Sequence, residues 1–80
     1  MELSASPGYT TRVTALIPAL AAEDRIVRQV AAEILGRLGP DAQAAIPALV
    51  RALHDSHGWV REAAAQALQK IDPHENQSRP

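Results

Sequence analysis

Residues 59–71 read WVREAAAQALQKI, and residues 26–38 read IVRQVAAEILGRL. Both stretches carry Val-Arg, Ala-Ala and Leu at matching places, and the matching places lie 33 positions apart. A period in this range is typical of stacked helical repeats, in which each unit buries an apolar face against the next one. The two stretches therefore predict an all-α fold.

The repeat extends beyond these two stretches. Residues 13–40 align with residues 46–73 without a gap, and ten positions of the alignment are identical. We therefore expect a short α-solenoid of two helix pairs, in about residues 11–40 and 41–73, which together form one domain of four helices.

The two ends of the sequence lack this pattern. Residues 1–10 are rich in Ser, Pro, Gly and Thr, and we interpret them as a flexible lead-in. Residues 74–80 contain no apolar residue, which favours a disordered tail.

The first helix pair is expected at residues 11–22 and 25–38. Pro18 lies inside the first of these helices, where its missing N–H predicts a bend rather than an end. Asp24 is placed to cap the second helix, and Gly39-Pro40 to stop it.

In the second pair, Asp41 is the expected cap of the third helix, and residues 42–45 are a candidate for a separate short turn before it. The fourth helix is expected at about residues 58–71, with Asp55 or Ser56 as its cap. At helical spacing, the apolar residues expected in the core are Val13, Leu16, Ile17, Leu20, Val27, Ala31, Ile34 or Leu35, Leu38, Ile46, Leu49, Val50, Leu53, Val60, Ala64, Ala67 or Leu68, and Ile71.

Composition argues against several classes of function. Eight basic and nine acidic residues are interspersed, so the chain has no basic surface of the kind that nucleic acid or an anionic membrane attracts. There is no cysteine, and no apolar run is long enough to span a membrane. We expect a cytoplasmic protein without a cofactor.

The repeated residues resemble the HEAT repeat, in particular the subtype named after phycobilisome lyases. The resemblance rests on Val-Arg, Ala-Ala and Leu-Gly in the first unit, and on Ile46-Pro47-Ala48-Leu49, Asp55, Val60-Arg61 and Ala64-Ala65 in the second. It implies that Asp55, Arg28 and Arg61 are structural, because in this family the turn Asp and the arginine commonly bond to one another or to the next repeat. The first unit has Ala22 in place of Asp55, so its copy of that bond would need Asp24.

Three residues are the candidates for partner contact, namely Trp59, Arg28 and Arg61. Trp59 could instead pack over the end of the third helix and close the stack. His54, His57, His74 and Asp55 could hold a metal, but an exposed polar turn explains them better, so no metal site is predicted. No catalytic residues are predicted either.

These observations predict a non-catalytic module for protein–protein interaction or assembly. An accessory unit of a chromophore lyase is the alternative that the resemblance implies, and nucleic-acid binding is a weaker one. Because at least about three repeats are normally needed for stability, two repeats leave apolar flanks to be covered by self-association, by a longer array or by a partner. Of these we expect a homo-oligomer.

Overall fold

The computed structural model describes residues 7–72, with the side chains of residues 11–72. The elements in chain order are α1 (Pro7–Ala19), α2 (Arg25–Leu38), the 3₁₀ segment η1 (Gly39–Ala45), α3 (Ile46–Ala52) and α4 (Gly58–Ile71). Within this part of the chain every regular element is helical, which confirms the predicted all-α class.

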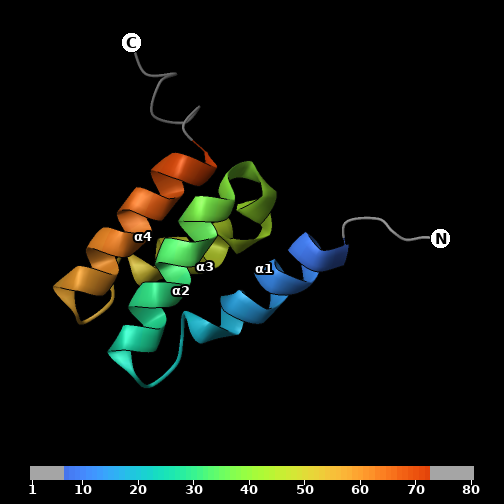
Figure 1. The fold of residues 1–80 in the computed structure, drawn as a ribbon. Helices are drawn as coiled ribbons and strands as arrows, with labels where there is room; N and C mark the ends of the chain where they lie inside the picture. Colours follow the sequence, from blue (N-terminus) through green and yellow to red (C-terminus); the bar gives the residue numbers. More distant parts are fainter. Residues whose placement is uncertain (1–6, 73–80) are drawn as a thin grey trace, which may run out of the picture.

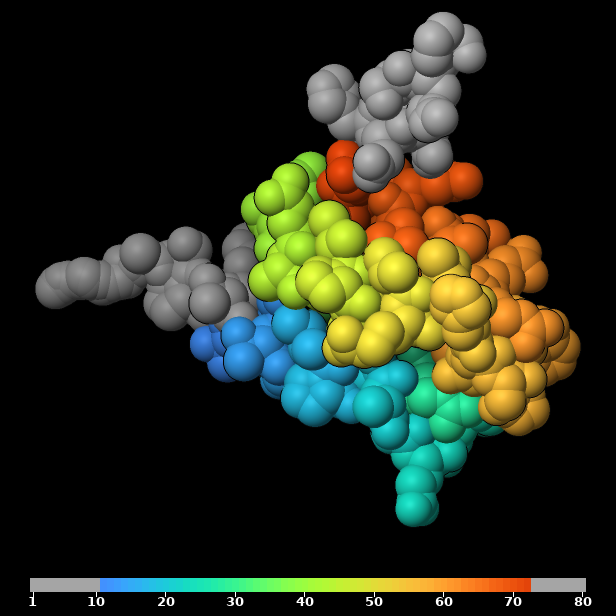
Figure 2. All heavy atoms as spheres, turned by 180° about the vertical axis from the view of Figure 1, so that it is seen from behind, coloured from blue at the N-terminus to red at the C-terminus, as the bar shows by residue number. Residues whose placement is uncertain are grey.

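The helices form two layers (Figure 1). The second helices of the two repeats, α2 and α4, run side by side in the same direction and form one layer. Seen from behind, α1, η1 and α3 form the opposite face (Figure 2). Contacts between α2 and α4, and between α1 and η1, join the first repeat to the second.

Four helices were predicted, but residues 7–72 contain only three long ones, of 13 or 14 residues. The third, α3, has seven residues and follows the seven residues of η1, which include the separate turn expected at residues 42–45. Two prolines, Pro40 and Pro47, lie in the first turns of these two short elements, where a missing N–H is tolerated. Between them Ala42 leaves the helical region, with φ −99° and ψ 22°, so one continuous helix does not form.

The bounds of the first helix also differ from the expected 11–22. Helix α1 begins at Pro7, a residue type whose fixed φ suits the first position of a helix, and it ends at Ala19. After Pro18, backbone bonds span three residues instead of four, as from Leu20 N to Ile17 O (3.1 Å) and Ala21 N to Pro18 O (2.9 Å). The helix thus tightens and ends near Pro18 rather than bending. Residues 1–6 of the expected lead-in and the expected tail at 74–80 lie outside the described residues.

The core between the layers consists mainly of small side chains. Its buried residues are Val13, Leu20, Ala31, Ala32, Leu35, Ala42, Ala45, Ala48, Leu49, Ala52, Val60, Ala63, Ala64, Ala67 and Ile71. Leu16, Ile17, Leu38, Ile46, Leu53 and Leu68 pack partly buried against it. Most of the predicted stripe is confirmed, but Val27 and Val50 are 43% and 44% exposed. Val60, the repeat counterpart of Val27, is fully buried, which shows that burial depends on which neighbour a repeat has.

Helices α2 and α4 approach most closely at Gly36. A Cβ atom placed on Gly36 would lie 3.0 Å from the Cα atom of Ala67 and 3.2 Å from its Cβ atom. Such contacts are tighter than ordinary van der Waals distance, and the backbone of Ala67 cannot turn aside as a long side chain can. The glycine is therefore what lets the two helices pack this closely.

We expect Gly36→Ala to lower the free energy of unfolding by about 1–2 kcal/mol. Removing a helical glycine normally stabilises a helix by up to about 1 kcal/mol, but here overpacking costs about 1–3 kcal/mol. Gly58→Ala is the matched control, because its new Cβ meets only the flexible Arg61 Nη2 at 3.4 Å. Urea unfolding followed by circular dichroism compares the two, and a Gly36→Ala protein as stable as the Gly58→Ala protein would contradict the packing argument.

Candidate functional site

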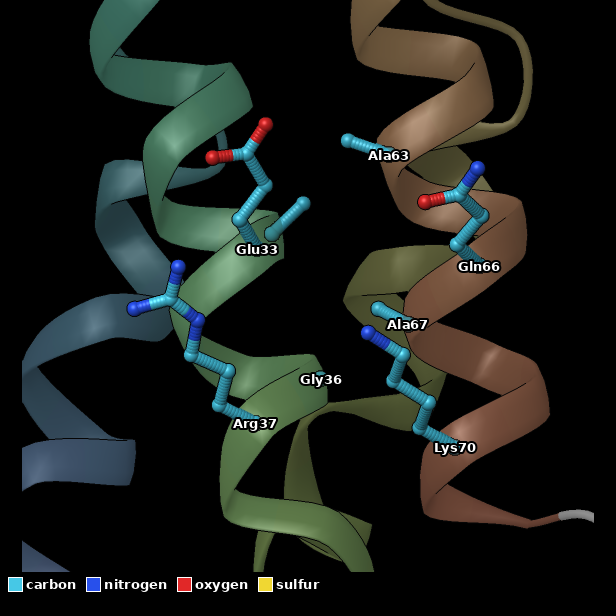
Figure 3. Close-up of a pocket in the computed structure, with 8 residues that line it drawn as sticks. Glu33, Gly36, Arg37, Ala63, Gln66, Ala67 and Lys70 are labelled. Atoms are coloured by element: carbon cyan, nitrogen blue, oxygen red, sulfur yellow. The ribbon is translucent and has the colours of Figure 1, made fainter.

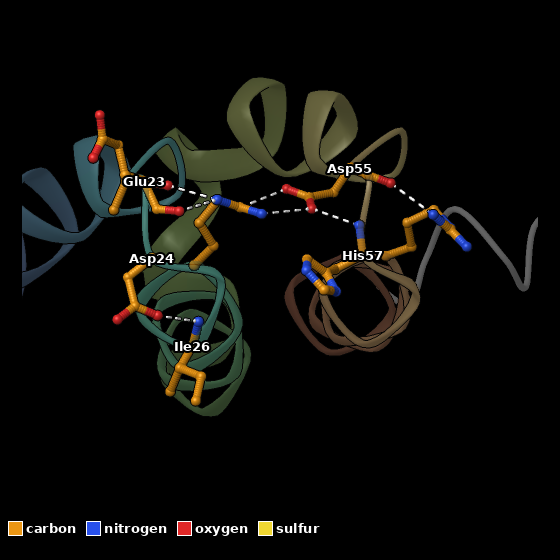
Figure 4. A network of polar contacts seen from close by, with 8 residues as sticks. Glu23, Asp24, Ile26, Asp55 and His57 are labelled. Carbon is orange, nitrogen blue, oxygen red and sulfur yellow. Dashed lines mark hydrogen bonds and ion pairs between the residues drawn. The ribbon is translucent and has the colours of Figure 1, made fainter.

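Arg28 joins the two repeats through the turns that precede α2 and α4, where Figure 4 shows Glu23 in the first turn and Asp55 in the second. Its Nε donates to Asp55 Oδ2 at 2.8 Å, and its Nη2 donates to Asp55 Oδ1 at 3.1 Å. Its Nη1 donates to the carbonyl oxygens of Ala22 (2.7 Å) and Glu23 (3.0 Å). The two charged side chains are only 14% and 10% exposed, so this bidentate pair is largely shielded from water.

Arg61, the repeat counterpart of Arg28, makes a simpler contact. Its Nη1 donates to the backbone oxygen of Asp55 at 2.7 Å, within its own repeat. The structure therefore contains the bonds that the sequence resemblance implied among Arg28, Arg61 and Asp55. Asp24 does not replace the missing turn aspartate of the first repeat; the carbonyl groups of Ala22 and Glu23 bind Arg28 there.

The predicted caps have mixed outcomes. Asp24 is the N-cap of α2 and accepts from Ile26 N at 2.8 Å, as predicted. Asp41 lies in the first turn of η1, and neither η1 nor α3 has a side-chain cap, so that prediction was wrong. The N-cap of α4 is His57 rather than Asp55 or Ser56; Asp55 Oδ1 accepts from His57 N at 2.9 Å and so holds the cap residue in place.

These contacts change the acidity of Asp55. Burial by itself would raise its pKa, but the hydrogen bonds from Arg28 and from the His57 backbone N–H, with the nearby positive charges, outweigh that effect. The pKa of Asp55 therefore lies below its ordinary value, and the carboxylate stays ionised under mildly acidic conditions.

Trp59 lies at the start of α4 with 63% of its surface exposed. The Cζ atom of Arg25 lies 5.1 Å from the centre of the indole ring, within the range of a cation–π contact. Most of the Trp59 surface is thus not packed against the described residues, whereas packing over the end of the third helix, the other interpretation, would bury more of it. Its ring is accessible to a partner.

An open groove lies between α2 and α4 (Figure 3). It has a volume of about 300 Å³, and Ala32, Gly36, Ala63 and Ala67 contribute its small residues. The longer lining side chains are Glu33 and Arg37 from α2 and Gln66 and Lys70 from α4. We call this surface the α2–α4 groove.

A shallower hollow continues the groove toward Trp59. It is lined by Gln29, Glu33, Trp59, Glu62, Ala63 and Gln66. The combined surface thus has an aromatic ring at one end, two glutamates next to it, and Arg37 and Lys70 toward the C-terminal ends of the helices. Sequence reasoning missed the groove, although Arg37 and Lys70 occupy matching positions of the two repeats.

Only one of the three predicted contact residues lies on this surface. Trp59 lines the extension of the α2–α4 groove, whereas Arg28 and Arg61 meet at Asp55, at the turn end of the repeats. His54 and His57 are exposed on that turn, and His74 lies outside the described residues. Among residues 7–72, no three His, Cys, Asp or Glu side chains gather as metal ligands would.

In a comparison with protein families, the model of HEAT repeats matches residues 13–79. The chain belongs to the HEAT-repeat family. The match is to HEAT repeats in general and does not confirm the phycobilisome-lyase subtype. Searches of curated proteins and of solved structures return no match for this HEAT-repeat chain. In the part of the chain that the structure describes, no helix is both long and apolar enough to cross a bilayer.

Proposed function

We propose that this HEAT-repeat protein is a non-catalytic interaction module that binds an extended segment of a partner protein along the α2–α4 groove. HEAT repeats generally mediate protein–protein interaction, which supports the class of function. The observation that carries the specific proposal is the continuous surface from Trp59 to Lys70, with a narrow floor of small residues between charged edges.

The lining side chains indicate what such a segment would look like. Its apolar residue would contact the exposed ring of Trp59, because aromatic residues dominate the energetics of many interfaces. Basic groups would lie near Glu33 and Glu62, and an acidic group would lie near Arg37 and Lys70. The floor at Gly36 would admit backbone or small side chains.

The same charges argue against the other candidate functions. A nucleic acid would present phosphates along the whole groove, and Glu33 and Glu62 would repel them. No feature of the groove favours a chromophore, so we propose no lyase role. A cytoplasmic location stays a proposal based on the sequence alone.

A library of random peptides displayed on phage tests this proposal without knowledge of the natural partner. Peptides are selected on the wild-type protein, and their affinities are then measured for variants. We expect Arg37→Glu with Lys70→Glu, and separately Trp59→Ala, to weaken binding about tenfold or more, which corresponds to about 1.4 kcal/mol.

Arg51→Glu is the matched control for charge reversal, because Arg51 is exposed on α3 in the opposite layer. It should leave the affinities unchanged. Selected peptides that bind the groove variants as tightly as the wild type, or a selection that enriches no peptide, would contradict the proposal.

A further inference from the structure

We propose that a second copy of this chain docks head-to-tail on the outer flank of α3 and α4, and so repeats the packing that joins the two repeats of one chain. This interaction is separate from the α2–α4 groove, so it extends the proposed function. It follows from a comparison of matching positions in the two repeats.

The outer flank of the second repeat, which we call the C-flank, surrounds an open hollow of about 340 Å³. It is lined by Ile46, Val50, Leu53, Ala65, Leu68, Gln69 and Asp72. Their counterparts 33 positions earlier are Val13, Ile17, Leu20, Ala32, Leu35, Gly36 and Gly39. The C-flank therefore consists of the same repeat positions that, in the first repeat, lie on the side of the second repeat.

In the first repeat these positions are filled. Val13 is 4% exposed, and Leu20 is 6% exposed. Leu35 is fully buried where α2 faces α4. In the second repeat, by contrast, Val50 is 44% exposed, and Leu53 and Leu68 are only partly buried. The same apolar positions are thus covered in the first repeat and open in the second.

The residues of the second repeat that cover these positions of the first repeat also have counterparts 33 positions earlier. Inside the chain, Ala63 and Ala67 of α4 face α2, and the buried Ala45 and Ala48 belong to η1 and α3, of which η1 packs against α1 and α2. Their counterparts in the first repeat are Arg12, Ala15, Val30 and Ile34, which we call the N-flank. Arg12 and Ala15 are exposed, Val30 is 41% exposed, and Ile34 is half-buried. The N-flank of one copy is therefore available to cover the C-flank of another.

Several side chains of the C-flank and the N-flank are larger than their counterparts in the contact between the two repeats of one chain. Gln69 replaces Gly36, so α4 cannot approach a neighbouring helix as closely as α2 approaches α4. Ile34 and Val30 replace Ala67 and Ala63, and these larger side chains fill the wider gap that Gln69 imposes. The helices of two copies would therefore lie farther apart than α2 and α4 do, and the larger side chains would fill the space between them.

Charge favours the head-to-tail arrangement over a symmetric one. The C-flank carries Asp72, and the N-flank carries Arg12, so unlike flanks bring opposite charges together. Two C-flanks would instead face each other with two aspartates, and two N-flanks with two arginines. A head-to-tail contact leaves one free flank at each end, so copies add in a row and the mass grows with concentration.

Two blocked variants test this geometry. Val50→Glu places a charge on the C-flank, and Val30→Glu places one on the N-flank; both positions are exposed, so folding should be retained. Each variant alone should associate at least about tenfold more weakly than the wild type, since burying an unpaired carboxylate is costly. Mixed in equal amounts, they should form a species of two chains and nothing larger, because each supplies the flank that the other lacks.

Sedimentation and light scattering across a concentration series measure these masses, and circular dichroism checks helix content. Gln43→Glu, exposed on η1 and part of neither flank, is the control and should associate as the wild type does. A wild-type protein that stays a single chain at millimolar concentration would overturn the proposal. So would dimers of Val30→Glu alone, which would mean that two C-flanks pair, or a mixture that stays monomeric. The peptide-binding residues Arg37 and Lys70 belong to neither flank, so failure here is distinguishable from failure of the proposed function.

Discussion

Replacing Leu35 by Ala should lower the free energy of unfolding by about 3 kcal/mol. Leu35 is fully buried between the two repeats, and truncating a buried leucine costs about 2–5 kcal/mol because a cavity remains. The loss is large for a domain of this size, whose total stability is marginal. Chemical unfolding of dilute protein, followed by circular dichroism, measures it.

Leu68→Ala is the matched control, because Leu68 occupies the same position of the second repeat. It is only partly buried, on the open C-flank, so the expected loss is about 1 kcal/mol. Equal losses for the two variants in dilute solution would contradict the structure. A loss for Leu68→Ala that grows with protein concentration would instead indicate that another copy covers this residue.

Replacing Asp55 by Asn should lower the free energy of unfolding by about 2 kcal/mol near neutral pH, as expected for hydrogen bonds between charged groups. The substitution keeps the size of the side chain but removes the charge that pairs with Arg28. Arg28 keeps its bonds to the carbonyl oxygens of Ala22 and Glu23, which limits the loss. Asp41→Ala, at an exposed position without a capping bond, should change stability by less than about 0.5 kcal/mol.

The pH dependence of this difference provides the second readout. Because the pKa of Asp55 is lowered in the folded protein, its contribution is complete above the unfolded pKa of about 3.9. It is lost as the pH falls through the lower pKa of the folded state. The wild type and the Asp55→Asn variant should therefore differ fully above about pH 4–5 and converge in stronger acid. A difference that stays constant down to low pH would show that the charge of Asp55 does not stabilise the contact.

The ion pair between Arg28 and Asp55, which we call the clamp, and the close approach of α2 to α4 at Gly36 together determine the shape of the α2–α4 groove. The clamp holds the turns before α2 and α4, and Gly36 sets how near the two helices lie further along. The α2–α4 groove has Gly36 on its floor, and its extension reaches Trp59 at the start of α4, next to the turn that the Arg28 contact holds. Its width therefore depends on two contacts that do not themselves line its charged edges.

The sequence by itself determined the repeat, its helices and much of its core. The spacing of 33 residues places Val60, Ala64 and Ile71 on one face of α4 and Leu35 on the facing side of α2, and this pattern depends only on helical periodicity. The cap at Asp24 was equally readable, since it requires only bonds to residues nearby in sequence. The link from Arg28 to Asp55 came from resemblance to a family rather than from the local pattern.

Only the tertiary structure decided which of two matching residues is buried. Val27 and Val60 are identical in the repeat, yet one is 43% exposed and the other is fully buried, because only the second has a repeat packed on that side. The short α3 likewise depends on how Pro40, Ala42 and Pro47 combine in space. The α2–α4 groove arises from the distance between two helices, which Gly36 and Ala67 set by contact across the interface. Periodicity specifies the face of each helix, but contact between helices specifies what that face meets.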